Sequence, residues 1–162
     1  MRWIETVGAL REYLVMLGGW VVSDDDNRPI IKNTELDIEI AVTGGDSHAG
    51  SGRAAACPQA ARRKGKATEK ACEHQQVLFP RPLPTPGRSL GTTGEGVRAG
   101  TWYLLYHWDG ENLRMELSHP TSCTNGQFDG WTTRVPLPAW QPDEKYWRAS
   151  DVGGGDVDFE VA

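Results

Sequence analysis

Large side chains are missing from the middle of this chain, and the gap limits how its 162 residues can fold. Between Gly44 and Gly100 the only aromatic residue is Phe79, whereas all seven Trp and all four Tyr lie outside this stretch. The stretch also contains ten of the nineteen Gly and five of the ten Pro. Such a composition offers little apolar surface to bury, so it cannot offset the entropy lost on folding. We therefore predict a disordered, basic, Gly/Pro/Ala-rich insertion over residues 44–100, set within one domain formed by residues 1–43 and 101–162 together.

Charge divides the chain at the same places. The insertion has nine Lys/Arg against four Asp/Glu, a net charge of +5, whereas residues 1–43 carry −4 and residues 101–162 carry −6. Phosphate contacts need clustered basic residues, so an acidic folded part argues against general nucleic-acid binding and favours a basic partner. Nucleic acid is expected at most weakly, through the basic cluster of the insertion, which consists of Arg62, Arg63, Lys64 and Lys66.

The N-terminal part combines a helical and a strand pattern. Apolar residues recur every three or four positions from Trp3 to Leu17, which predicts an amphipathic helix that Gly18-Gly19 ends. Strict alternation between Leu36 and Val42 predicts a strand with one buried and one solvated face.

The C-terminal part has the pattern of a sheet. Two strand-like runs flank Asp109-Gly110, which predicts a hairpin. Residues 120–130 are rich in Ser, Thr, Asn and Gly and predict a loop, and further strands are expected at 131–135 and 157–161. The predicted fold class is α+β, with the N-terminal helix packed on a mainly antiparallel β-sheet that the insertion interrupts.

Residues able to hold a metal or to perform catalysis form no recognisable motif. Cys72-x-His74 and His119-x3-Cys123 lack the spacing of zinc fingers and ribbons. The acidic run that starts at Asp24 has Pro29 where an EF-hand loop needs glycine. Nucleophile elbows and phosphate-binding loops are absent as well, so we expect no cofactor.

The compartment follows from the cysteines and the N-terminus. Three cysteines are too few and odd in number for a disulfide framework, which favours free thiols in a reducing environment. Glu5, Arg11 and Glu12 interrupt the apolar N-terminus, and the uncharged run from Tyr13 to Ser23 is too short to cross a bilayer. We expect a soluble cytoplasmic protein without membrane contact; an intracellular location in the nucleus stays open.

Aromatic residues crowd into the stretch from Trp102 to Trp147. Exposed Trp and Tyr anchor protein interfaces and stack on sugar rings. The sequence therefore predicts a non-enzymatic interaction domain whose C-terminal aromatic residues contact a protein partner, as in an inhibitor, an immunity-type protein or a viral accessory protein. The candidate binding residues are Trp108, Trp131, Trp140, Tyr146 and Trp147. Two alternatives remain, a glycan-binding module using the later Trp residues and a small enzyme with acid–base chemistry at His107 and His119.

Overall fold

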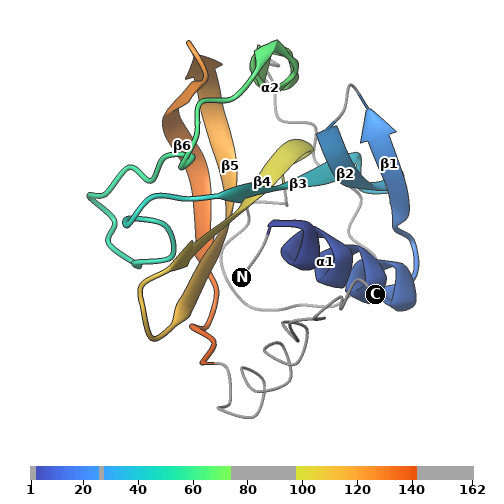
Figure 1. Cartoon of the computed structure of the whole chain (residues 1–162). Coiled ribbons are helices and arrows are strands. Elements are labelled where there is room, and N and C mark those ends of the chain that lie inside the picture. Colours follow the sequence, from blue (N-terminus) through green and yellow to red (C-terminus); the bar gives the residue numbers. More distant parts are fainter. Residues whose placement is uncertain (1–2, 26–27, 74–97, 142–162) are drawn as a thin grey trace, which may run out of the picture.

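The computed structural model describes residues 3–25, 28–73 and 98–141. Within them lie two helices and six strands, arranged as an α+β fold with a largely antiparallel sheet (Figure 1). The predicted fold class is confirmed. In chain order the elements are α1 (Trp3–Leu17), β1 (Val21–Asp25), β2 (Arg28–Asn33), β3 (Ile38–Gly44), α2 (Lys66–Glu73), β4 (Gly100–Trp108), β5 (Leu113–Thr124) and β6 (Gln127–Pro136).

The strands follow one another across the sheet in chain order, from β1 at one edge to β6 at the other. Every neighbouring pair is antiparallel except β3 and β4, which run parallel with Ile38 beside Gly100 and Gly44 beside Tyr106. Parallel neighbours need a crossover connection, and residues 45–99 provide it. The predicted insertion therefore leaves the sheet from β3 and returns to it at the adjoining strand β4.

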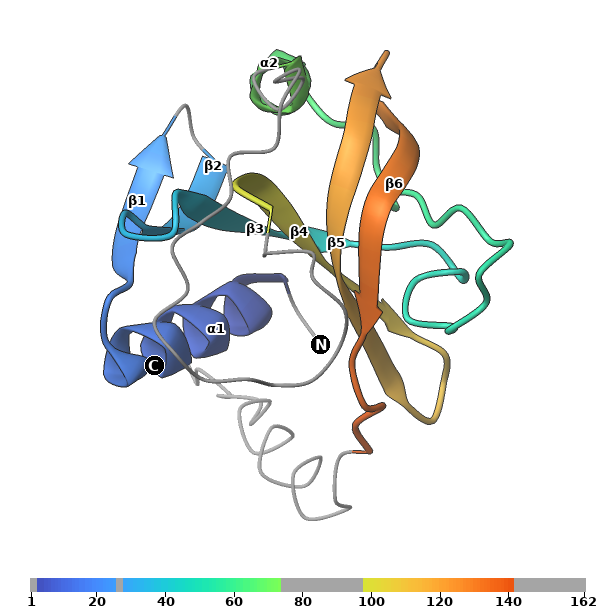
Figure 2. The ribbon, with the colours of Figure 1, turned by 180° about the vertical axis from the view of Figure 1, so that it is seen from behind.

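Helix α1 covers one face of the sheet, along the half formed by β1, β2 and β3 (Figure 2). Its predicted apolar stripe packs there through Val7, against Ile40 and Trp102 of the central strands. Gly18 and Gly19, with φ of +82° and +77°, end the helix because glycine adopts left-handed backbone without a steric cost.

The opposite face of the sheet has its own core. Tyr103 and Phe128, both nearly fully buried, meet there with a ring-centroid distance of 4.8 Å, and Cys72 of α2 packs beside them. Ile40 and Val42 of β3 are buried as predicted, but Ala41 on the other face is buried too and Glu39 is half-buried, so the face predicted to be solvated is largely covered. The physical reason is that α1 covers one side while α2 and its preceding segment cover the other.

Strands β5 and β6 are longer than the sequence suggests. Residues 120–130, predicted as a loop, belong to these strands except for a two-residue turn at Asn125 and Gly126. Both turn residues have positive φ, +52° and +74°, as a type I′ hairpin turn requires. The prediction was wrong because Ser and Thr on a solvated strand face resemble loop composition, whereas the Asn-Gly pair was the informative signal.

Gly126 is also tightly enclosed, because a Cβ there would lie 2.5 Å from the carbonyl oxygen of Lys64. We predict that Gly126→Ala destabilises the fold by about 2–4 kcal/mol, from backbone strain and this clash together. Gly52 is the matched control, since its φ is +67° but nothing lies within 4 Å of its Cβ position. Gly52→Ala should cost only about 1–2 kcal/mol in urea unfolding, and equal losses would contradict the account of the Gly126 contact.

Residues 45–73, the first part of the predicted insertion, pack on the sheet. The side chain of Gln59 donates to the carbonyl of Phe128 (2.7 Å) and accepts from its N–H (3.0 Å). Ala49, Pro58 and Cys72 are buried. The expectation of disorder from Gly44 to Gly100 is therefore too broad for this part, because small buried residues and hydrogen bonds to the sheet replace large apolar side chains. Residues 74–97 lie outside the described residues.

One buried ion pair joins this segment to the sheet. Glu116 of β5 is fully buried and accepts hydrogen bonds from Arg134 Nε (3.0 Å) and Nη2 (2.8 Å), from Ser118 Oγ (2.7 Å) and from the Gly50 N–H (2.8 Å). Arg134 Nη1 also donates to the carbonyls of Arg53 (2.9 Å) and Ala56 (2.7 Å). Burial alone would raise the pKa of Glu116, but these hydrogen bonds outweigh it and hold the pKa below its usual value.

Candidate binding surface

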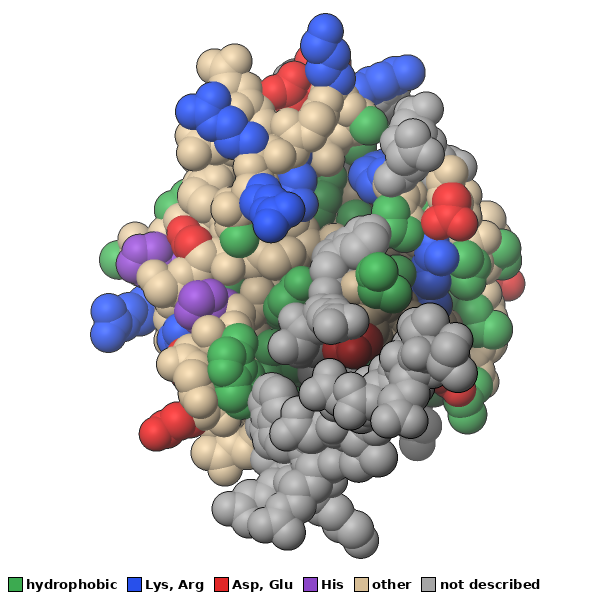
Figure 3. Space-filling view, in the orientation of Figure 1, with side chains coloured by type: hydrophobic (Ala, Val, Ile, Leu, Met, Phe, Trp, Pro, Cys, Tyr) green, Lys and Arg blue, Asp and Glu red, His purple; other side chains and the backbone are tan. Residues whose placement is uncertain are grey.

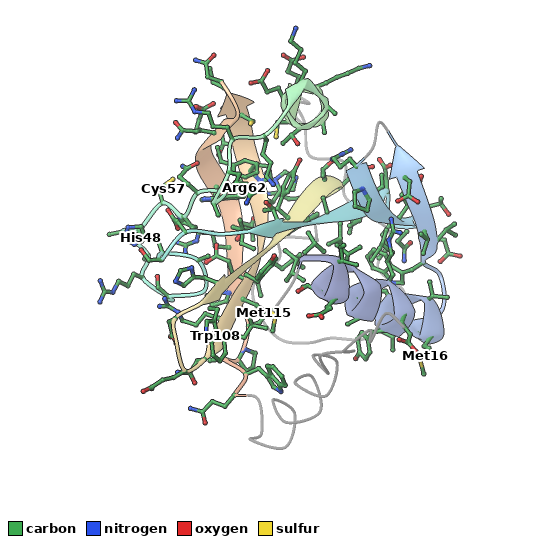
Figure 4. The ribbon with its side chains drawn as sticks, viewed as in Figure 1. Met16, His48, Cys57, Arg62, Trp108 and Met115 are labelled. Atoms are coloured by element: carbon green, nitrogen blue, oxygen red, sulfur yellow. The ribbon has the colours of Figure 1, made fainter. Side chains whose placement is uncertain are left out.

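Two of the predicted binding residues, Trp108 and Trp140, come together at the end of the β4–β5 hairpin. Trp108 pairs with Leu113 across the hairpin, and Trp140 exchanges two backbone hydrogen bonds with the same Leu113 (2.8 and 3.0 Å). Trp108 is half-buried, and Figure 4 shows it at this end of the hairpin. Trp140 is 37% exposed. This end of the sheet therefore carries two partly accessible Trp residues, one on each side of Leu113.

Trp131 has a different environment from the one predicted. Its Nε1 donates to the carbonyl of Pro58 (2.9 Å), and its ring lies 4.6 Å from that of Phe128. The side chain is half-buried and holds the segment before α2 on the sheet. A ring fixed in this way is a poor stacking platform, and Trp131 lies opposite Pro120 of β5 whereas Trp140 lies opposite Leu113, at the other end of that strand. Tyr146 and Trp147 lie outside the described residues.

A larger apolar area lies at the junction of α1 and β1, and the sequence analysis missed it. Six large apolar side chains there are between 42% and 80% exposed. We call this group the α1–β1 surface: Tyr13, Val15, Met16 and Leu17 at the end of α1, with Val22 on the sheet face that α1 covers and Val21 on the edge of the opposite face, beside Lys32. Met16 is the most exposed and projects from the end of α1 away from the sheet (Figure 4). The available signal was the uncharged run from Tyr13 to Ser23, which leaves the last turn of the helix without a polar face.

The local fold explains why this surface is held in place. Val7, Leu10 and Leu14 use the packed side of α1, so the residues around the end of the helix remain outside the core. Arg11 then ties the helix to the edge strand β1, because its Nη2 donates to the carbonyl of Ser23 (3.1 Å) and pairs with the carboxylate of Asp24. The apolar side chains are thus displayed on two elements whose relative position is fixed.

Exposed acidic residues occur on the two elements that carry the α1–β1 surface. Glu5 and Glu12 are exposed on α1, and Asp24 is exposed on β1. The only cation on these two elements, Arg11, is already paired with Asp24. The apolar group consequently has Glu12 as an exposed acidic neighbour on α1, whereas Asp24 is paired with Arg11 and Lys32 lies beside Val21.

The described residues offer no arrangement for acid–base catalysis by the two candidate histidines. His107 Nδ1 lies 3.3 Å from the carbonyl of Gly45, and His119 Nε2 lies 3.2 Å from that of Ala99. His107 pairs with Arg114, whereas His119 follows Ser118, the partner of Tyr103, so the two histidines lie well apart along the β4–β5 ladder. Burial lowers the pKa of His119, whose ring packs edge-on against Trp102. Each histidine thus has a structural contact of its own.

Cys72 and Cys123 are buried free thiols, and burial raises the pKa of Cys72 to about 12, so it is protonated at neutral pH. Within residues 3–25, 28–73 and 98–141, no three His, Cys, Asp or Glu side chains are grouped closely enough to hold a metal ion. His74 lies outside these ranges.

Comparison with protein-family models, with curated proteins and with solved structures found no match for this chain. Neither of the helices in the described part of the chain has the length and apolar character needed to span a bilayer.

Proposed function

We propose that this chain is a non-enzymatic protein-binding domain and that the α1–β1 surface contacts its partner. The observation that carries the proposal is the group of six large apolar side chains, 42–80% exposed, on two adjoining elements. Concentrated exposed apolar area of this kind is typical of sites where another protein docks. Met and Tyr, both present here, are among the residues enriched in such interfaces.

The charge of the two elements indicates the chemistry of the partner. Exposed carboxylates on α1 and β1, of which Glu12 lies nearest to the apolar residues of the helix end, favour a partner whose apolar contact residues are accompanied by Lys or Arg. Occupying a basic protein in this way is the mode of action of an inhibitor, an immunity-type protein or a viral accessory protein. Salt should weaken the complex by slowing association, because charges at the rim of an interface act mainly on the encounter rate.

Affinity measurements on matched variants test the proposal. The full chain, tagged and expressed in the cells that produce it, is used to identify a partner, which is then purified for titration calorimetry. We predict that Leu17→Ser raises the dissociation constant about tenfold or more, because Leu17 is 62% exposed at the end of α1, next to Met16. Val135→Ser is the matched control: Val135 is 43% exposed on β6 and should change affinity less than about twofold.

Two results would reject this proposal. Equal increases of the dissociation constant in Leu17→Ser and Val135→Ser would show that the partner does not bind at the α1–β1 surface. A monomer–dimer equilibrium in sedimentation that Leu17→Ser abolishes would show that a second copy of this chain covers the surface instead.

Glycan binding is a second candidate, favoured by the positions of Trp108 and Trp140. The two side chains belong to residues on either side of Leu113, and Trp140 is 37% exposed. Indole rings stack on sugar faces. Quenching of tryptophan fluorescence by oligosaccharides, lost in Trp140→Ala and insensitive to salt, would favour this candidate over the protein-binding one.

A further inference from the structure

A pocket opens between the sheet and the segment that leads into α2. Its volume is about 260 Å³. Arg28, Thr43 and Tyr103 line it from strands β2, β3 and β4, and Lys64, Gly65 and Thr68 line it from the opposite side. Two cations therefore face one space from elements that are distant in sequence.

The two cations are not equally neutralised. Arg28 Nη2 donates to Glu39 Oε1 (2.8 Å) and its Nη1 lies 3.5 Å from the Tyr103 hydroxyl, whereas its buried Nε has no hydrogen-bond partner among the described residues. Lys64 is half-buried, and no carboxylate in the described ranges pairs with its ammonium. Burial lowers the pKa of Lys64, as expected for an ammonium that has lost water without gaining a counter-ion.

The surroundings of the pocket add positive potential to an otherwise acidic protein. Arg62, Arg63 and Lys66 are exposed next to Lys64, and Lys and Arg side chains gather over α2 in Figure 3. Helix α2 begins at Lys66, directly at the pocket, so the positive end of its dipole also points toward this region. The basic cluster of the sequence thus lies beside a cavity.

We infer that this pocket binds a small anion of the phosphate class, such as a phosphomonoester, through Lys64 and Arg28. The Lys64 ammonium supplies the unpaired charge, and the Arg28 guanidinium supplies a second cation held in place by Glu39. The hydroxyls of Thr43 and Tyr103 line the same space but already have partners within the protein, the carbonyl of Gly44 (3.4 Å) and Arg28 (3.5 Å), so the two cations provide the recognition of the anion. This site lies on the sheet face opposite α1, so ligand and protein partner would occupy different surfaces.

Titration of the full chain with phenyl phosphate and with inorganic phosphate, followed by amide NMR shifts at constant ionic strength, tests the inference. The amides of Gly65, Ala67 and Thr68 should shift in a saturable manner with both probes. Lys64→Met should raise the dissociation constant about tenfold, which is the usual effect of losing one charge-assisted contact. Lys70→Met is the matched control, because it removes the same charge from the exposed side of α2 and should change the constant less than about twofold.

Each other outcome overturns the inference. Equal shifts with sodium chloride, or equal weakening by both Lys variants, would show only general attraction to a basic surface. Tight binding of a single-stranded oligonucleotide without saturable binding of phenyl phosphate would assign the cluster to nucleic acid instead. If Lys64→Met does not fold, the amide shifts of the unaltered chain decide: shifts elsewhere than at residues 65–68 reject the site.

Discussion

Replacing Arg134 by methionine is expected to lower the free energy of unfolding by about 3–5 kcal/mol. The substitution leaves the carboxylate of Glu116 fully buried and without its charged partner. It also removes the two hydrogen bonds from Arg134 Nη1 to the carbonyls of Arg53 and Ala56. Urea unfolding of the variant and the unaltered chain measures the loss, and faster hydrogen exchange of the Gly50 amide should accompany it.

Arg114→Met is the control for Arg134→Met, because both residues lie in the β5–β6 half of the sheet and both pair with a carboxylate. Arg114 Nε lies 3.3 Å from Asp109 Oδ2, but that pair is partly exposed, at 24% and 29% of the two side chains. Pairs of this kind contribute about 0–1 kcal/mol. Similar losses for the two variants would mean that the Glu116–Arg134 pair is not specially important to the fold.

The same ion pair gives the stability a defined pH dependence. The folded-state pKa of Glu116 is below its usual value, so its ionised form is favoured by folding. Its contribution is complete above the unfolded-state pKa, about 4.3, and is lost as pH falls through the lower folded-state pKa. The acid-induced loss should therefore be smaller in Arg134→Met, where this source of stability is already absent.

Phe128→Ala is the second substitution with a large expected effect, about 3–5 kcal/mol of lost stability. Phe128 is only 2% exposed and its ring contacts both Tyr103 and Trp131, at centroid distances of 4.8 and 4.6 Å. Truncation leaves a cavity at the centre of the core that joins β4, β6 and the segment before α2. Calorimetric or urea unfolding measures the loss.

Val135→Ala is the comparison for Phe128→Ala, since Val135 is an apolar residue of the same strand with 43% of its side chain exposed. Its loss should stay below about 1 kcal/mol, as for most surface substitutions. A loss at Phe128 no larger than that at Val135 would show that the second face of the sheet carries no packed core.

The parts of the fold that the sequence predicted are those set by local periodicity. The stripe from Trp3 to Leu17 became α1, and the runs around Asp109-Gly110 became the β4–β5 hairpin. What composition could not predict is the packing of residues 45–73, because it depends on single long-range contacts. One such contact joins Gln59 to the backbone of Phe128, and another joins Arg134 to the carbonyls of Arg53 and Ala56. Single contacts of this kind produce no periodic pattern in the sequence.

The candidate site shows a similar division. The density of aromatic residues made Trp131 a candidate binding residue. Its indole N–H, however, donates to the carbonyl of Pro58, which lies 73 positions away in the chain. The α1–β1 surface was overlooked because apolar residues in a helix suggest a core, and only the structure shows which of them the sheet covers. Tyr13, Met16 and Leu17 remain outside because α1 meets the sheet through Val7, Leu10 and Leu14.

The central claim, that the α1–β1 surface is where the partner docks, is tested most directly by site-specific photo-crosslinking. A photoreactive phenylalanine analogue replaces Met16 in one full-length chain and Val135 in another, and both are irradiated in the cells that produce the protein. We predict that position 16, 80% exposed in the free chain, yields an adduct with one other protein whose crosslinked segment is rich in Lys and Arg, and that position 135 does not. Equal adducts at both positions, or adducts at position 16 with a second copy of this chain alone, would contradict the claim.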